Sequence, residues 1–157
     1  MKRTLLTIWL ATTLALAPEL RAEGFADGLR AYDAGDYAAA YSVWSDLARR
    51  GDAEAEAAIA GLYLQGLGVE RSAAQAAVWY RRAAKRGLMA ARMNLGDLYA
   101  AGRGVRRDYV MAYLWLSLAA AQGSTWSARR RDEIAKVMSA TDIAEAEALA
   151  RAFKAKP

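Results

Sequence analysis

The chain has 157 residues, 55% of them hydrophobic and only two of them proline, which suits a single domain of packed helices. It contains no cysteine and no histidine, and this excludes disulfides, thiolate chemistry, and the commonest general base and metal ligand. The formal net charge of +5 does not by itself indicate a nucleic-acid ligand, because basic residues mostly alternate with acidic ones.

Residues 1–22 have the pattern of a secretory signal peptide. Lys2 and Arg3 precede an apolar run over residues 4–17, which is shorter than the roughly 20 residues needed to span a membrane. Pro18 interrupts the run, and Ala22 offers a small residue at which cleavage can occur. We therefore expect a periplasmic or secreted protein; the alternative is an uncleaved segment anchored in the inner membrane.

Residues 24–51 predict a first pair of helices. A short helix over residues 24–32 is followed by a tight turn and a second helix over residues 37–49. Asp36 is a suitable N-cap for the second helix, because its carboxylate accepts bonds from free backbone N–H groups. Ala40 is small enough for the two helices to approach closely, and Trp44 is expected to fill the space between them.

Residues 52–124 contain one motif twice at a spacing of 36 residues. The recurring elements are Leu62-Tyr63 and Leu98-Tyr99, Gly66-Leu67-Gly68-Val69 and Gly102-Arg103-Gly104-Val105, Trp79 and Trp115, and the endings at Gly87 and Gly123. A fixed period of this length indicates stacked supersecondary units. We predict two units, residues 52–88 and 89–124, each with a helix A, a glycine loop and a helix B.

The two glycine loops are interpreted as turns. The first glycine of each suits a left-handed helix C-cap, the second permits a tight reversal, and the valine packs back against the helices. Ser72 and Asp108 are expected to cap the helices that follow. A glycine-rich loop can also hold phosphate, but these loops follow a helix and lack both a third glycine and a Gly-Lys-Ser/Thr sequence.

Together these motifs resemble the Sel1-like repeat, a relative of the tetratricopeptide repeat. The resemblance covers residues 53–124 and implies an all-α solenoid of stacked antiparallel helix pairs. It also implies a binding scaffold rather than an enzyme, with no cofactor and no bound metal. The unit at residues 24–51 is similar to the second half of a tetratricopeptide repeat, and its shorter turn is typical of a terminal unit.

Residues 125–157 predict a C-terminal helical cap. One helix is expected over residues 126–138, and Ser139 is expected to cap the next. The preceding helix, over residues 109–121, is apolar nearly all round, which is typical of a helix buried on two sides. We therefore expect the C-terminal pair to cover it. This segment resembles the end of bacterial secreted Sel1-repeat proteins.

The resemblance to tetratricopeptide repeats places helix A of each unit on the concave surface. In that register the residues facing a ligand are Phe25, Leu29, Tyr32, Asp33, Glu54, Gln65, Met93, Asn94 and Asp97. This groove lacks the basic set with which some such repeats hold a peptide carboxylate. A peptide with apolar anchors and basic residues would suit it better.

Other chemical groupings are interpreted as structural. Basic groups at residues 81–86, 103–107 and 129–131 could bind an anionic partner, but no aromatic residues interleave with them, which favours a solvated surface. Glu54 and Glu56 point about 200° apart on a helix and cannot share a site; they and the pair Glu145 and Glu147 are interpreted as solubilising. The tryptophans at positions 44, 79 and 115 are predicted to fill the core rather than stack on a ligand.

The sequence therefore favours an exported, non-catalytic, monomeric scaffold that binds an unidentified protein or peptide. We expect no nucleic-acid ligand, and no membrane span after signal cleavage. One alternative is a cell-wall or β-lactam hydrolase, a label that some Sel1-like proteins carry. Those relatives are rich in cysteine, whereas this chain has no Cys, no His and no Ser-x-x-Lys sequence. The other alternative is a membrane-anchored regulatory adaptor that retains residues 1–22.

Overall fold

The structure, a computed structural model, describes residues 18–154 of the chain. Residues 1–17, which hold most of the predicted signal peptide, and residues 155–157 lie outside the described part. Within residues 18–154 the chain forms eight α-helices and no strand. In chain order these are α1 (Pro18–Asp33), α2 (Tyr37–Arg49), α3 (Ala53–Gln65), α4 (Ala73–Lys85), α5 (Met89–Ala101), α6 (Tyr109–Ala120), α7 (Thr125–Ala135) and α8 (Ala140–Lys154).

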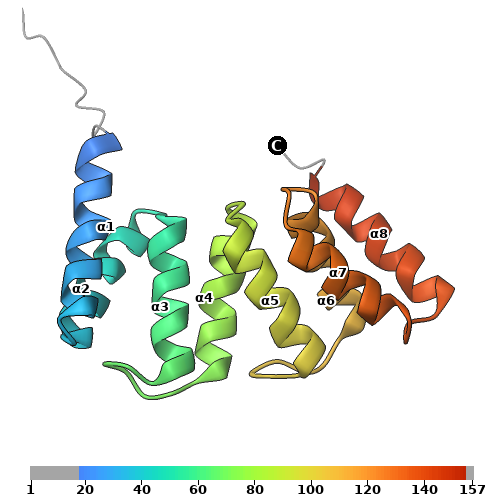
Figure 1. The fold of residues 1–157 in the computed structure, drawn as a ribbon, viewed down its shortest axis with the longest axis horizontal. Helices are drawn as coiled ribbons and strands as arrows, with labels where there is room; N and C mark the ends of the chain where they lie inside the picture. The colour runs from blue at the N-terminus through green and yellow to red at the C-terminus, as the bar shows by residue number, and fades with distance from the viewer. Residues whose placement is uncertain (1–17, 155–157) are drawn as a thin grey trace, which may run out of the picture.

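Helix pairs follow one another along the long axis of the molecule (Figure 1). Helix α1 pairs with α2, α3 with α4 and α5 with α6, and each pair also packs against the next. This arrangement confirms the predicted all-α solenoid of stacked helix pairs. None of the helices in residues 18–154 combines the length and the apolar character that crossing a membrane requires.

The C-terminal helices cover α6, as predicted. Both α7 and α8 pack against α6. The ring of Trp115 on α6 meets Phe153 of α8 edge-on, with 5.3 Å between ring centroids. This cover explains why α6 is apolar on nearly all sides.

The largest differences from the predicted helix boundaries are at the start of α1 and at the end of α7. Helix α1 begins at Pro18 rather than at residue 24. Proline suits the first position of a helix, because its ring fixes a helical φ and its missing N–H is not needed there. Helix α7 ends at Ala135 rather than at residue 138, because the C-cap at Lys136 bonds back to Glu133 and Ile134 and closes the last turn.

The predicted caps are confirmed. Asp36 accepts a hydrogen bond from the amide of Ala39 at 3.0 Å. Asp108 accepts one from Met111 at 3.0 Å, and Ser72 accepts one from Gln75 at 3.2 Å. The C-caps after α3 and α5 are left-handed glycines, with φ of 72° at Gly66 and 66° at Gly102.

The second glycine of each loop forms the joint between units. A Cβ atom on Gly68 would lie 2.7 Å from the carbonyl carbon of Tyr37, at the start of α2. One on Gly104 would lie 2.2 Å from the backbone of Ala73, at the start of α4. Both glycine loops lie at the same edge of the array, the lower edge in Figure 1. The glycines therefore allow each loop to touch the backbone of the preceding unit.

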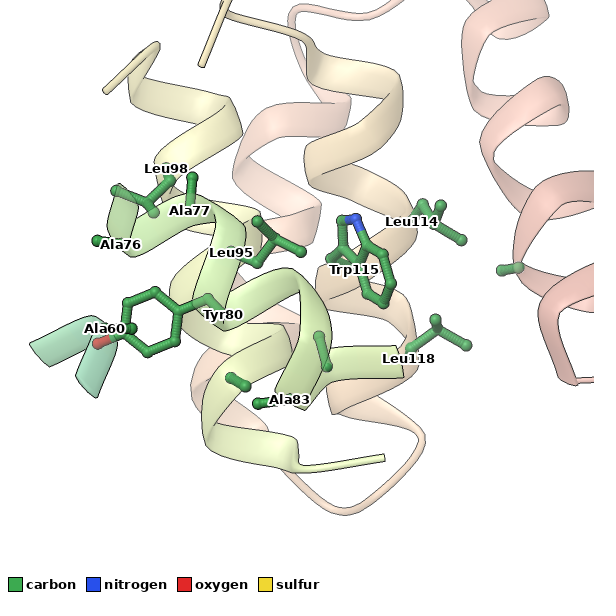
Figure 2. Close-up of a cluster of buried hydrophobic side chains, with 13 residues drawn as sticks. Ala60, Ala76, Ala77, Tyr80, Ala83, Leu95, Leu98, Leu114, Trp115 and Leu118 are labelled. Carbon is green, nitrogen blue, oxygen red and sulfur yellow. The ribbon is translucent and has the colours of Figure 1, made fainter. Parts of the chain in front are cut away.

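The tryptophans at positions 44, 79 and 115 all pack against the core, as predicted, but Trp79 is only partly buried and Trp44 and Trp79 are not at equivalent positions. The counterpart of Trp44, 36 residues on, is Tyr80, which is buried against Ala60 (Figure 2). Trp115, the counterpart of Trp79, is only 3% exposed, whereas Trp79 is only partly buried. Phe153 of α8 meets the ring of Trp115, whereas the Arg82 guanidinium of α4 lies over the ring of Trp79.

Candidate binding surface

A hollow of about 210 Å³ lies between α1, α2 and α3. We call it the N-terminal hollow; its lining residues are Leu29, Tyr32, Trp44, Ala58, Gly61, Leu62 and Gln65. Three of the predicted ligand-facing residues, Leu29, Tyr32 and Gln65, therefore meet around one depression. Leu29 is 43% exposed, so a large apolar side chain borders this depression.

The hollow exists because one wall is built from small residues. Ala58 and Gly61 are one turn apart on α3 and leave the space beside Leu29 unfilled. A Cβ atom added to Gly61 would meet no other heavy atom within 4 Å. The space is therefore open enough to admit a side chain from outside.

The opposite wall is a rigid aromatic cluster. The ring of Phe25 stacks on Trp44 with 5.7 Å between centroids, and the Trp44 Nε1 donates to the Phe25 carbonyl at 3.4 Å. Tyr32 lies 6.0 Å from Trp44 and meets Tyr37 edge-on at 5.2 Å. Phe25 is half-buried and supports the wall, so the hollow is preformed rather than created by a ligand.

Two predicted acidic residues lie outside the hollow. Asp33 is exposed at the C-terminal end of α1, and Glu54 is exposed in the first turn of α3. Gln65 is also exposed, and its side-chain amide donates to the carbonyl of Gly61 at 3.3 Å.

The predicted groove residues on α5 are engaged with the protein itself. Asp97 forms an ion pair with Arg130 of α7 at 3.3 Å, and Arg130 also reaches Glu133 at 3.1 Å. The Met93 sulfur accepts a hydrogen bond from Ser124 at 3.6 Å. Asn94 is exposed, and its amide donates to its own helix at 2.8 Å. These contacts use the polar groups of α5 internally, in contrast to the open surface of α3.

The structure corrects the interpretation of Glu56 as a solubilising residue. Its side chain is fully buried, and its carboxylate accepts hydrogen bonds from Arg82 at 3.1 Å and Arg86 at 3.2 Å. The Arg82 guanidinium also lies over the ring of Trp79, 4.4 Å from the centroid. Since Glu54 and Glu56 point in nearly opposite directions, one of them had to face α4.

Several arginines interpreted as solvated surface residues form hydrogen bonds to a neighbouring helix. Arg81 donates to the hydroxyl of Tyr99 at 2.9 Å, in addition to the ties that Arg82 and Arg86 make to Glu56. Arg103, in the second glycine loop, is exposed as predicted. Among the described residues, no group of three or more acidic side chains is placed to hold a metal ion.

Comparisons with known proteins identify the repeat. The family model described as Sel1 repeat matches residues 53–88 and 90–124. A protective antigen of uropathogenic Escherichia coli strains, displaying an SLR fold, superposes with a TM-score of 0.79 at 29% identity over 85% of this chain. A Sel1 repeat protein from Oxalobacter formigenes superposes with a TM-score of 0.62 at 32% identity over 68% of this chain.

The chain spans only 29% of the first of these proteins and 43% of the second. A search of curated proteins finds no match. The two matched repeats and the shared helical architecture show that this chain contains two Sel1 repeats within a helical repeat scaffold, of the kind that supports protein–protein interaction.

Proposed function

We propose that the protein is an exported, non-catalytic scaffold that binds a peptide segment of a partner protein. One apolar side chain of the segment enters the N-terminal hollow. The observation that carries this proposal is the hollow itself, with exposed Leu29 on one side and the open space over Gly61 on the other.

The size and rigidity of the hollow support an apolar anchor. A volume of about 210 Å³ accommodates one aliphatic or aromatic side chain. Burying such a side chain contributes about 1.5–3 kcal/mol, and a preformed site leaves most of the ordering cost to the peptide. The stacked rings of Phe25 and Trp44 hold the wall in place before the ligand arrives.

The charges beside the hollow favour basic residues next to the anchor. Asp33 and Glu54 are both exposed on the helices that border it. Exposed carboxylates of this kind contribute mainly to the rate and specificity of association. The preferred ligand is therefore an apolar residue flanked by lysine or arginine.

Export is part of the same proposal and rests on the pattern of residues 1–22. Sequencing the N-terminus of the mature protein tests it. A chain beginning at Glu23 supports export with cleavage, whereas a chain that retains residues 1–22 supports the membrane-anchored adaptor.

Peptide selection tests the binding site. A random peptide library is selected on the purified protein, and the selected peptides are titrated against Leu29→Asp by calorimetry. Leu149→Asp is the matched control, because Leu149 is 39% exposed but lies on α8 at the other end of the array. We expect the affinity to fall at least about tenfold in Leu29→Asp and to stay unchanged in the control. Equal affinities for both variants would refute the assignment of this surface.

A further inference from the structure

A second, larger hollow lies between α6, α7 and α8, at the opposite end of the array from the first. Its volume is about 450 Å³. We call it the C-terminal hollow; its lining residues are Tyr113, Ser117, Ala120, Ala121, Ala128, Arg131, Glu147, Ala150, Arg151 and Lys154. The volume lies in the range of small-molecule sites, and the lining combines an alanine floor with a few charged side chains.

The hollow exists because two long side chains of the preceding unit have short counterparts here. Thirty-six residues before Ser117 and Ala128 stand Arg81 and Arg92. Arg81 reaches the hydroxyl of Tyr99 at 2.9 Å, and Arg92 donates to the carbonyl of Ala84 at 3.1 Å. Ser117 and Ala128 cannot reach across in this way, so the space between α6 and α7 stays open beneath α8.

Three cations border this space and only one carboxylate does. Arg131 is only 28% exposed and is held in place, since it donates twice to Asp132 at 2.9 and 2.7 Å and lies 5.9 Å from the Tyr113 ring centroid. Arg151 is 71% exposed, and its nearest contact to Glu147 is 3.8 Å, too long and too exposed to bind it firmly. Lys154 forms no ion pair with any residue in the described range.

Two residues that carry hydroxyl groups, Ser117 and Tyr113, also line the space. The Oγ of Ser117 is covered from solvent and has no hydrogen-bond partner among the described residues. Burial is the largest cause that raises the pKa of Tyr113 above its ordinary value, and the nearby Glu147 carboxylate raises it further, in part through a hydrogen bond with the phenol.

We propose that the C-terminal hollow binds a small ligand that carries a phosphate or carboxylate group on an apolar body. The oxyanion is bound by Arg151 and Lys154, at the edge of a space that Ser117 and Tyr113 also line. The apolar body lies on the alanine floor. This site is separate from the N-terminal hollow, so the result of its test does not affect the peptide-binding proposal.

The test is an NMR titration of the full-length protein with defined probes. Phenyl phosphate and benzoate represent soluble phosphate and carboxylate ligands, and vesicles of phosphatidylglycerol represent a lipid headgroup. We expect a soluble probe to give saturable shifts at the amides of Ala120, Ala128 and Arg151, with a Kd of about 1 mM or lower. Saturable binding to vesicles at the same amides would assign the oxyanion to a lipid. The absence of saturable shifts with all three probes would overturn the proposal.

Two variants and one control locate the site. Ser117→Arg restores the residue type of the preceding unit and fills the hollow, and Arg151→Glu reverses the charge of an exposed side chain that folding does not need. Both should weaken binding about tenfold or more. Arg103→Glu makes the same charge change on an exposed loop and should leave binding unchanged. Unchanged binding in Arg151→Glu, with circular dichroism confirming its fold, would contradict the assignment whatever the outcome for Ser117→Arg.

Discussion

The two Sel1 repeats of this chain share a motif and differ in what covers them. In the repeat at residues 53–88, Trp79 of α4 is only partly buried against the core, and the Arg82 guanidinium lies over its ring. In the repeat at residues 90–124, the corresponding Trp115 is covered by Phe153 of α8. The same residue at the same motif position is thus half-buried in one copy and fully packed in the other, so the motif determines the backbone and the neighbouring helices determine burial.

The first helices of the two repeats, α3 and α5, also differ in which of their surface residues contact a neighbouring helix. Ala58 and Gly61 of α3 correspond to Asn94 and Asp97 of α5, 36 residues on. The small pair leaves the N-terminal hollow open, whereas Asp97 pairs with Arg130 of α7 at 3.3 Å. Residues at positions that the repeat motif does not specify therefore decide which part of the surface of α3 and α5 remains available to a partner.

The largest expected difference between the repeats is at the two tryptophans. Replacing the buried Trp115 with alanine should lower the free energy of unfolding by about 4 kcal/mol, because a large cavity opens in a packed core. Trp79→Ala should lower it by about 2 kcal/mol, since that ring is only partly buried. Guanidinium unfolding of both variants measures the difference. Equal losses of unfolding free energy in the two variants would contradict the conclusion that Trp115 is more fully packed than Trp79.

The next largest effect on stability is expected at Glu56, the buried carboxylate of the first Sel1 repeat. Glu56→Ala should destabilise the protein by about 2 kcal/mol, because Arg82 and Arg86 lose their acceptor. The loss is below that of a fully buried pair, since these arginine side chains are 44% and 47% exposed and water replaces part of the interaction. Glu54→Ala, at an exposed position two residues earlier, is the control and should change stability by less than about 0.5 kcal/mol.

Replacing a glycine by alanine should lower stability at Gly96 of α5 and raise it at Gly61 of α3. A Cβ atom on Gly96 would lie 2.8 Å from Cγ of the fully buried Leu116, so Gly96→Ala should destabilise by about 1–3 kcal/mol. Gly61→Ala should stabilise by up to about 1 kcal/mol, because alanine is the better helix former and the added atom meets nothing. The melting temperatures of the two variants should move in opposite directions; a fall in both would contradict the open space at Gly61.

The smallest effect concerns alkaline pH. Burial raises the pKa of Tyr80, so its phenol ionises more readily in the unfolded chain than in the folded one. This contribution to stability is fully present below about pH 10 and is lost as pH rises through the folded-state value. Leu116, the corresponding residue of the other repeat, cannot titrate. Tyr80→Phe should therefore show a shallower loss of stability above about pH 10 in urea unfolding; an unchanged slope would contradict the burial effect.

Sequence reasoning succeeded where the determinants are local. The period, the glycine C-caps and the Asp36, Ser72 and Asp108 caps depend on residues close together in the chain, so the fold followed from them. The burial of Glu56 could not be predicted in the same way, because its two arginine partners are on the next helix and each residue alone resembles an ordinary surface charge.

The candidate site was predicted only in part, for a similar reason. Three residues of the predicted register, Leu29, Tyr32 and Gln65, lie around one hollow, and their role in binding stays a prediction. It could not show that Asp97 is paired with Arg130, because that contact depends on how α7 packs outside the recognised repeats. The residue 36 positions after Trp44 is Tyr80. The sequence alone therefore indicates that Trp79 does not occupy the position equivalent to Trp44.

The binding role of the N-terminal hollow is tested most directly by filling it. Gly61→Leu places a side chain in the open space without a steric clash at its Cβ atom, so the helix should remain as stable as in the wild type. Calorimetric titration of a selected peptide should show at least about a tenfold loss of affinity, with a melting temperature equal to or above that of the wild type. A Gly61→Leu protein that binds the peptide as tightly as the wild type would contradict the account.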